Sequence, residues 1–248
     1  MFPPDNPLEN PTFPQMSVRK WDGWRPVSPP EDTVTRSALV SESRTGSSGL
    51  PGDAPSRRMP ERVLQTLITG PGWIDEVVDW NRVYPGDSDR MRLTIELAKQ
   101  NVLRRTGGPF GAAIFDRATG RLVSIGVNSV VRLNNSASHA EMLAITFAQA
   151  RLGSYTLQDS GLDHELVTSC DPCAMCLGAV LWSGVRRLVA GAGRDDAAAI
   201  NFDEGPVFPE SYAYLESRGI TITRGVLRAE AAAIIEFYRE QGGPIYNA

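Results

Sequence analysis

The chain of 248 residues is poor in the residue types that mark several special classes of protein. It has only two histidines and three cysteines. Its longest apolar runs, such as residues 188–192, are far too short to span a bilayer, and the first residues lack the basic start and apolar core of a secretory leader. The 25 Lys and Arg are outnumbered by 29 Asp and Glu, so no basic footprint for nucleic acid is visible. We therefore expect a cytosolic protein without a membrane segment, for which a nucleic acid partner is not favoured.

Proline divides the chain into two parts of different composition. Eleven of the 18 prolines lie in residues 1–60, among many Ser, Gly and Asp. Residues 41–58 have no periodic apolar face, which is typical of segments that cannot bury enough apolar surface to fold. We predict a disordered arm over residues 1–60, a lead-in segment with a short helix over residues 61–86, and a folded domain over residues 87–248.

The folded part alternates between helical and strand periodicities. A helix is predicted to begin at Asp87 or Ser88 and to end near residue 105. Two strands then flank a Thr-Gly turn, and helices alternate with strands to the end of the chain. The predicted strands are residues 111–116, 121–128, 165–169, 186–192 and 220–224; the predicted helices after the first are residues 139–152, 173–182, 210–218 and 228–240. This order implies a parallel or mixed sheet with helices on both faces.

All three cysteines lie within seven residues, as Cys170, Cys173 and Cys176. Such a cluster can form a disulfide, fill a core or hold a metal. In a cytosolic protein a Cys-x-x-Cys is more often a metal or redox motif than a structural disulfide. The neighbouring Asp171 and Pro172 argue against deep burial of the cluster.

A histidine and a glutamate complete this pattern. His139 and Glu141 form H-A-E at the start of one predicted helix, and Cys173 and Cys176 open another. Thiolates are favoured at a helix N-terminus, and one imidazole with two thiolates suits zinc. Three protein ligands leave a fourth position for water, and Glu141 is spaced to miss the metal yet exchange protons with that water.

The motifs H-A-E and P-C-A-M-C resemble those of the zinc-dependent cytidine and nucleobase deaminase superfamily. The resemblance covers roughly residues 87–246 and leaves out the N-terminal arm. It implies a three-layer α/β/α cytidine-deaminase-like sandwich with a central five-stranded mixed sheet. It also implies zinc on His139, Cys173 and Cys176, a proton-shuttle role for Glu141, and a place for Cys170 near the ligands but not among them.

Longer stretches are most similar to bacterial guanine deaminases: GGPFGAAI (residues 107–114), the VN of GVNSV, and SCDPCAMCLGAVLWSGV (residues 169–185). This resemblance implies that Asn128 hydrogen-bonds the base and that Phe110 stacks on it. It further implies that the Ala140 N–H meets a purine acceptor and that Trp182 closes the pocket wall.

Two further roles come from the same resemblance. An acidic residue about thirty positions after the cysteines assists proton transfer, and here the candidates are Asp203 and Glu204, with Glu204 better spaced. The C-terminal tail can cross to a partner subunit, which would make Tyr246 an aromatic cap in a homodimer. The sequence departs from the guanine group at Asp171, where Glu is usual, and in residues 157–165, where His164 is expected on the surface.

We accordingly expect hydrolytic deamination of a free base, from guanine to xanthine and ammonia. The alternatives are another small base (cytosine, a modified purine or a triazine), a nucleoside, a tRNA adenosine, or a zinc protein that reuses the fold only for binding. A protein that only binds would have no use for a proton shuttle. The presence of Glu141 beside a complete set of candidate ligands therefore argues against the last alternative.

Overall fold

The structure is a computed structural model that describes residues 65–158 and 161–246. The predicted arm over residues 1–60 lies outside the described residues, and its disorder stays a prediction. The helices are α1 (Ile74–Val77), α2 (Asp87–Leu103), α3 (Val130–Leu133), α4 (Ala140–Leu152), α5 (Ala174–Ser183), α6 (Arg194–Ala198), α7 (Pro209–Ser217) and α8 (Arg228–Glu240). The strands are β1 (Gly111–Asp116), β2 (Leu122–Val127), β3 (His164–Cys170), β4 (Arg187–Ala192) and β5 (Thr221–Thr223). The predicted elements are therefore present, and the short helices α3 and α6 are additional.

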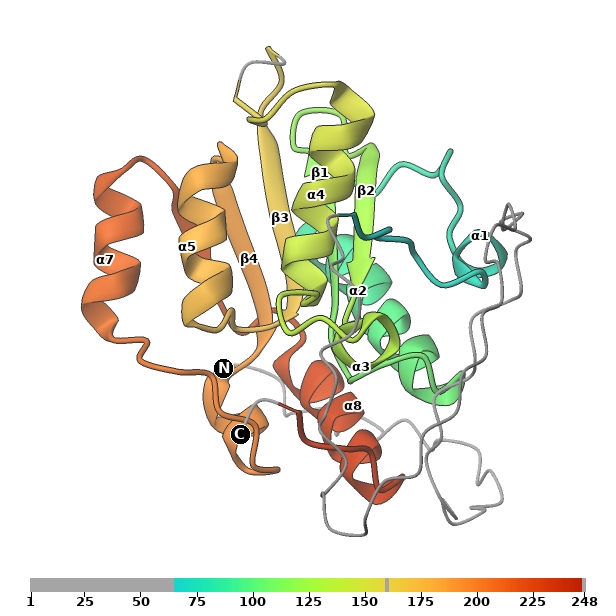
Figure 1. Cartoon of the computed structure of the whole chain (residues 1–248). Coiled ribbons are helices and arrows are strands. Elements are labelled where there is room, and N and C mark those ends of the chain that lie inside the picture. The colour runs from blue at the N-terminus through green and yellow to red at the C-terminus, as the bar shows by residue number, and fades with distance from the viewer. Residues whose placement is uncertain (1–64, 159–160, 247–248) are drawn as a thin grey trace, which may run out of the picture.

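The five strands form one mixed sheet in the order β2-β1-β3-β4-β5. Strand β1 is antiparallel to both of its neighbours, whereas β3, β4 and β5 run parallel. Helices cover both faces (Figure 1), which confirms the predicted three-layer α/β/α architecture. Cys170 pairs with Ala192 where β3 and β4 end, and the carboxyl ends of parallel strands are where α/β folds bind ligands.

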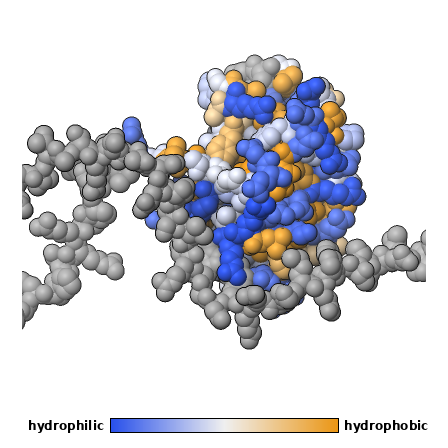
Figure 2. Space-filling view, turned by 90° about the vertical axis from the view of Figure 1, so that its right-hand side faces the viewer, coloured by the Kyte–Doolittle hydropathy of each residue, from blue (hydrophilic) through white to orange (hydrophobic). Residues whose placement is uncertain are grey.

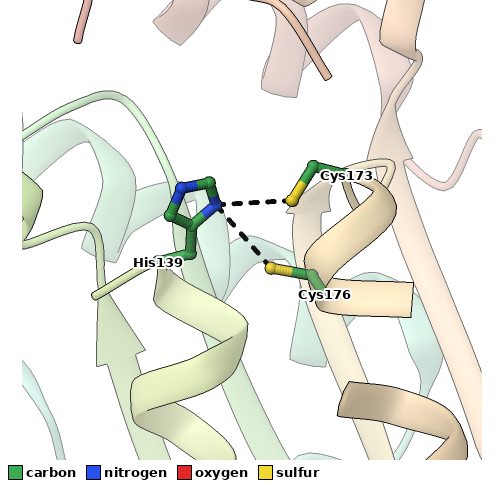
Figure 3. A group of neighbouring side chains, drawn as sticks. All are labelled: His139, Cys173 and Cys176. Carbon is green, nitrogen blue, oxygen red and sulfur yellow. Dashed lines mark hydrogen bonds between the residues drawn. The ribbon is translucent and has the colours of Figure 1, made fainter. Parts of the chain in front are cut away.

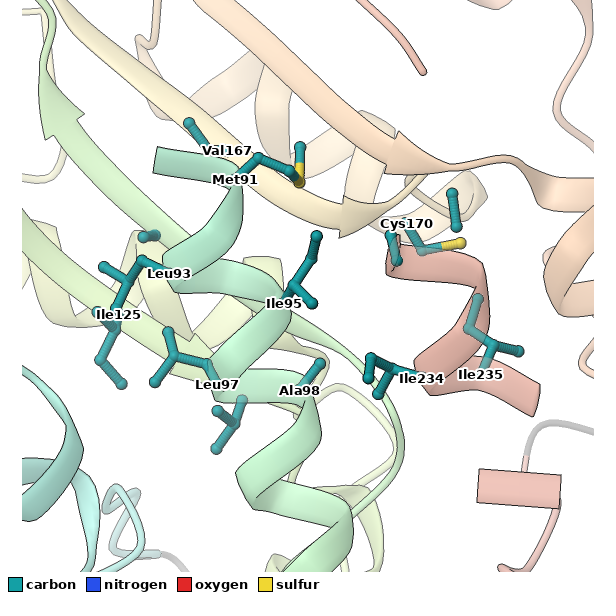
Figure 4. Close-up of a cluster of buried hydrophobic side chains, with 14 of the residues drawn as sticks. Met91, Leu93, Ile95, Leu97, Ala98, Ile125, Val167, Cys170, Ile234 and Ile235 are labelled. Carbon is teal, nitrogen blue, oxygen red and sulfur yellow. The ribbon is translucent and has the colours of Figure 1, made fainter. Parts of the chain in front are cut away.

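Two apolar clusters hold the layers together because alternate strand residues face opposite sides. Val167 and Val189 pack with α2 and α8 on one face, and Leu166 and Leu188 pack with α4 and α5 on the other. Figure 4 shows the first cluster, in which side chains of α2 meet those of α8 beneath the sheet.

Helix α4 approaches the sheet closely because Gly126 on β2 has no side chain. A Cβ at Gly126 would lie 2.0 Å from the Ala140 carbonyl oxygen and 2.5 Å from the Ala144 nitrogen. Replacing Gly126 with Ala would therefore push the first turn of α4 away from the sheet. That turn follows His139 directly, so this glycine sets the position of a predicted metal ligand.

The lead-in segment is mostly irregular and packs on the domain. Its one helical turn among residues 65–86 is α1, and Trp73 is buried with its Nε1 donating to Thr106 Oγ1 at 3.0 Å. Arg132 donates to the Thr69 carbonyl oxygen. A domain boundary between residues 86 and 87 remains a prediction.

The described residues on the β2 side of the molecule present interspersed hydrophilic and hydrophobic side chains (Figure 2). No helix among the described residues is long and apolar enough to cross a bilayer.

The expectation that His164 lies on the surface is wrong. His164 is the first residue of β3 and is fully buried, with its Nδ1 2.9 Å from the Leu157 carbonyl oxygen. The segment after α4 folds back over the start of β3, and this tertiary contact removes the imidazole from solvent.

A buried ionic cluster holds the end of the sheet opposite Cys170. The Glu165 carboxylate is 0% exposed and accepts hydrogen bonds from Arg90 and Arg187. Arg187 also donates to both oxygens of Asp87, each at 2.6 Å, and so joins β4 to the start of α2. The hydrogen bond from Arg187 lowers the pKa of the Asp87 carboxyl group.

Replacing Arg187 with Met is expected to lower the free energy of unfolding by about 1.5–3 kcal/mol, because the buried Glu165 carboxylate loses one of its two arginine partners while Arg90 remains. Urea denaturation measures this loss. Arg117→Met is the matched control, since Arg117 pairs with Asp163 in an exposed bridge whose loss costs at most about 1 kcal/mol. Because the pKa of Asp87 is lowered, its contribution is present above about pH 4 and is lost as the pH falls through the folded-state value. Equal losses in the two variants would contradict this role for Arg187.

Candidate metal centre and cavity

His139, Cys173 and Cys176 converge at the N-termini of α4 and α5. His139 is the N-cap residue of α4, and Cys173 is the N-cap residue of α5. The His139 Nδ1 lies 3.5 Å from Cys173 Sγ and 3.7 Å from Cys176 Sγ (Figure 3). These three side chains form a group whose ligand atoms lie within 4.8 Å of one another.

This donor set fits zinc. With Zn–N and Zn–S bonds of about 2.0 and 2.3 Å, tetrahedral zinc separates a nitrogen ligand from a sulfur ligand by about 3.6 Å. The observed separations agree with that value. The hydrogen bond with Cys176 lowers the pKa of the Cys173 thiol to about 4, so one sulfur of the pair has thiolate character without a metal.

Cys170 does not belong to this group. It is 3% exposed and lies in the apolar cluster between β3 and α8 (Figure 4). Its Sγ faces the Gly193 carbonyl oxygen at 3.7 Å. Burial raises the pKa of the Cys170 thiol well above its usual value, and therefore Cys170 is a packed neighbour with the properties of a neutral thiol.

Glu141 lies beside the three candidate ligands in the first turn of α4. It is buried, Thr168 Oγ1 donates to its Oε1 at 3.0 Å, and Cys176 Sγ lies 3.4 Å from its Oε2. Burial raises the pKa of the Glu141 carboxyl group. Thr168 on β3 thus fixes the carboxylate at the edge of the metal group, a role for which the sequence contains no recognisable motif.

A second carboxyl group faces the same cavity from the loop after α6. Burial, followed by the charges of Cys173 and Glu141, raises the pKa of Glu204 to about 7. The Glu204 carbonyl oxygen accepts a hydrogen bond from Ala174 N at 3.0 Å. Two carboxyl groups with raised pKa values therefore flank one small space.

The cavity brings together residues from the N-termini of α4 and α5, the ends of β1 to β3, and the C-terminal tail. It is lined by Phe110, Asn128, His139, Ala140, Glu141, Cys170, Asp171, Cys173, Phe202, Glu204 and Tyr246. Among these, Phe202 and Asp171 were not expected as lining residues. The Asp171 carboxylate is held by Arg224, whose Nε donates to Oδ1 at 2.9 Å.

Three aromatic rings close the cavity. Phe202 is central, with its ring centroid 5.1 Å from both Phe110 and Tyr246. Tyr246 of the same chain lines the cavity beside Phe110 and Phe202. Its hydroxyl packs against Gly108, where a Cβ would lie 2.1 Å from it. The free volume left is about 10 Å³, roughly the room of one water molecule.

Asn128 is held by the backbone around it. Its N–H donates to the Phe110 carbonyl oxygen at 3.0 Å, and its own carbonyl oxygen accepts from Asn101 Nδ2 at 2.8 Å. Asn101 also donates to the Gly108 carbonyl oxygen at 2.8 Å. This buried amide on α2 therefore ties together two walls of the cavity.

Two predicted site residues lie elsewhere. Trp182 is 80% exposed on α5 and lines a separate groove with Tyr214 and Arg218, so within this chain it does not close the pocket wall. Asp203 does not line the cavity; its Oδ1 accepts a hydrogen bond from Gly205 N at 2.8 Å. Within this chain neither side chain reaches the cavity, because the backbone turns both of them away, and their predicted contacts with a base stay predictions.

Comparison with known proteins agrees with the geometry. Residues 86–192 match the family described as the cytidine and deoxycytidylate deaminase zinc-binding region. The guanine deaminase of Bacillus subtilis is 37% identical over 130 residues, 52% of this chain and 80% of that protein. The tRNA-specific adenosine deaminase of Buchnera aphidicola is 30% identical over 127 residues, 51% of this chain and 77% of that protein.

Solved structures extend the similarity to most of the described residues. A guanine deaminase from Nitrosomonas europaea is 44% identical with a TM-score of 0.67, over 70% of this chain and 96% of that one. The protein NE0047, solved in complex with 2,6-diaminopurine, is 45% identical with a TM-score of 0.68, over 73% of this chain and 96% of that one. The chain therefore belongs to the cytidine and deoxycytidylate deaminase zinc-binding family and is an enzyme of the zinc-dependent hydrolytic deaminase class.

Proposed function

We propose that this protein deaminates free guanine, with water, to xanthine and ammonia, and that it works as a homodimer. The observation that carries the reaction is the buried Glu141 carboxylate, held by Thr168 beside His139, Cys173 and Cys176. Similarity to proteins named as guanine deaminases supports the choice of base.

Zinc would be held by His139, Cys173 and Cys176, and when bound it supplies a Lewis acid that lowers the pKa of water to about 7. Glu141 lines the cavity beside this group, where its carboxyl group can take a proton from water and return it to the ring nitrogen or the leaving amine. A carboxyl group whose pKa is raised by burial suits this exchange, because it can accept and release the proton near neutral pH.

The remaining polar groups are placed to recognise a flat purine. The first N–H groups of a helix lack intrahelical acceptors, so Ala140 N–H at the start of α4 can donate to a ring acceptor. Asn128 can donate and accept at an amide-like edge. Glu204, with a pKa of about 7, faces the same space and can exchange a proton with the departing amino group.

The experiment is ammonia release by the zinc-loaded protein over a panel: guanine, 2,6-diaminopurine, adenine, cytosine, guanosine and a tRNA anticodon stem-loop. We expect guanine to have the highest kcat/KM. Turnover of the stem-loop with guanine inert would favour the tRNA activity that the Buchnera relative is named for. The net charge of −4 argues against RNA, because phosphate contacts need a basic surface.

The aromatic closure requires the C-terminal tail to move when a base enters, since about 10 Å³ cannot hold a purine. Replacing Tyr246 with Ala is expected to raise KM for guanine about 10-fold or more, because base stacking on an aromatic ring is lost. Steady-state kinetics measures this. Ile245→Ala is the control, since Ile245 is partly exposed and does not line the cavity. An unchanged KM in Tyr246→Ala would remove Tyr246 from the substrate site.

The homodimer is proposed through the surface between α5 and α7. Two pockets on this surface share Leu181 and Tyr214; the first is also lined by Trp182 and Arg218, and the second by Glu210. Trp182 and Tyr214 are exposed. If two copies meet on this surface about a two-fold axis, Glu210 of one copy lies toward Arg218 of the other. The surface is therefore complementary in charge to a second copy of itself.

Light scattering after size exclusion is expected to give a dimer for the native protein and a monomer for Trp182→Glu. Tyr155→Glu, which changes an equally exposed aromatic on another surface, should stay dimeric. Mixing Glu141→Gln protein with Tyr246→Ala protein tests whether the C-terminal tail crosses to the partner subunit. Recovered activity would mean that the tails are exchanged. No recovery would mean that each tail closes the site of its own chain.

A further inference from the structure

The loop of residues 203–207, which carries Glu204, has little regular structure of its own. It follows α6 and precedes α7, and Gly205 adopts a left-handed conformation with φ of +69°. The Asp203 carboxylate accepts from Gly205 N, and Val207 N donates to the Gly205 carbonyl oxygen at 2.9 Å. These local bonds shape the turn, and the bond from Ala174 N to the Glu204 carbonyl oxygen at 3.0 Å joins its first half to α5.

Arg194 supplies a long-range connection for this loop. Its Nη2 donates to the Gly205 carbonyl oxygen at 2.8 Å, and its Nη1 donates to the Val207 carbonyl oxygen at 2.7 Å. The two acceptors flank Pro206, so one planar guanidinium group spans the turn directly after Glu204. A fork of this kind fixes orientation as well as distance, which a single donor cannot do.

Arg194 itself rests on a braced element. It is the first residue of α6, directly after the end of β4. The next two residues, Asp195 and Asp196, both accept hydrogen bonds from Arg228 on α8, and Asp196 Oδ2 also accepts from Gly193 N at 2.7 Å. The backbone that carries Arg194 is therefore held between the end of β4 and α8.

We propose that Arg194 is a positioning residue for the reaction: it holds the Glu204 carboxyl group at the cavity without touching the substrate. The inference rests on the proposed function, in which Glu204 exchanges a proton with the departing amino group. Arg194 does not line the cavity, so its effect passes through the loop backbone. Displacing a reacting group by about 1 Å can cost about 100-fold in rate.

The kinetic test is a double-mutant cycle on the zinc-loaded protein. Arg194→Met is expected to lower kcat for guanine about 10- to 100-fold and to change KM less than about 3-fold. In a Glu204→Gln background the same substitution should lower kcat less than about 2-fold, because the group it positions is already gone. Arg117→Met is the control, since that arginine contacts the exposed Asp163 and should change neither parameter.

Hydrogen exchange of the backbone amides supplies a second measurement that needs no substrate. Arg194→Met should speed exchange at residues 205 and 207 and leave α5 unchanged, while zinc content and melting temperature stay close to those of the native protein. Equal losses of kcat in both backgrounds, or unchanged exchange in the loop, would overturn the proposal. A native protein that leaves guanine untouched would overturn the proposed function instead, and the exchange measurement would still decide whether Arg194 holds the loop.

Discussion

Glu141→Gln should lower kcat for guanine by about 10²- to 10⁴-fold, the range that a positioned general acid–base group contributes. The amide has nearly the shape of the carboxylate, and its oxygen can still accept the hydrogen bond from Thr168 seen at 3.0 Å. Position is thus preserved while proton exchange is lost. KM should change little, because the interaction removed belongs to the transition state.

Single-turnover and steady-state ammonia release measure the effect of Glu141→Gln. Glu76→Gln is the matched control, since Glu76 pairs with Arg104 at the surface and should retain full rate. Zinc content must equal that of the native protein for the comparison to hold. A Glu141→Gln enzyme that keeps its rate within a few-fold would refute the assignment of the proton exchange to Glu141.

Cys176→Ser should abolish tight metal binding. Bound zinc is expected to fall from about one ion per chain to less than a tenth, because each of the three candidate ligands would be needed for a tetrahedral catalytic centre. The melting temperature should fall as well, because metal that binds the folded state stabilises it. Elemental analysis after dialysis against a weak chelator and calorimetry measure the two effects.

Cys170→Ser is the control that distinguishes a packed thiol from the two thiols assigned as metal ligands. Cys170 lies three residues from Cys173, as Cys176 does, but it packs in the apolar cluster with its Sγ facing the Gly193 carbonyl oxygen. The variant should keep its zinc and lose only stability, by about 1–3 kcal/mol for a buried hydroxyl group in a site shaped for a thiol. Equal loss of zinc from Cys170→Ser and Cys176→Ser would contradict the assignment of the ligands.

The success of the sequence in locating the metal group has a local cause. His139 and Glu141 are two residues apart, Cys173 and Cys176 are three apart, and each pair begins a helix. One member of each pair is the N-cap residue and the other lies in the first turn, so their mutual position follows from local backbone geometry at a helix start. The sheet is required only to bring the two helix N-termini together, and the predicted order of helices and strands already favoured such a sheet.

The position of Trp182 outside the cavity of its own chain has a geometric reason. Six residues along an α-helix correspond to about 240° of rotation, so Trp182 cannot share the face of Cys176. Resemblance to a motif placed it in the pocket, whereas helical periodicity places it on the outer face of α5, where it is 80% exposed. If it contacts a base, it does so from a second chain.

The sequence contains two adjacent carboxylates, Asp203 and Glu204, and their distance from the cysteines favoured Glu204 as the residue that assists proton transfer. The positive φ of Gly205 and the Asp203 side-chain bond to its N–H decide which of them faces the cavity. Neighbouring side chains in such a turn diverge, and the sequence does not say which one points inward.

The sequence by itself determined the order of helices and strands, the three candidate ligands and the glutamate beside them, because these depend on periodicity and short spacing. Only the tertiary structure decided that Thr168 holds Glu141, that Phe202 lies against both Phe110 and Tyr246, and that Arg194 spans the Glu204 loop. These contacts join residues from 11 to 92 positions apart. Separations of this size carry no periodic signal in the sequence, because the contacts form only when the layers pack on one another.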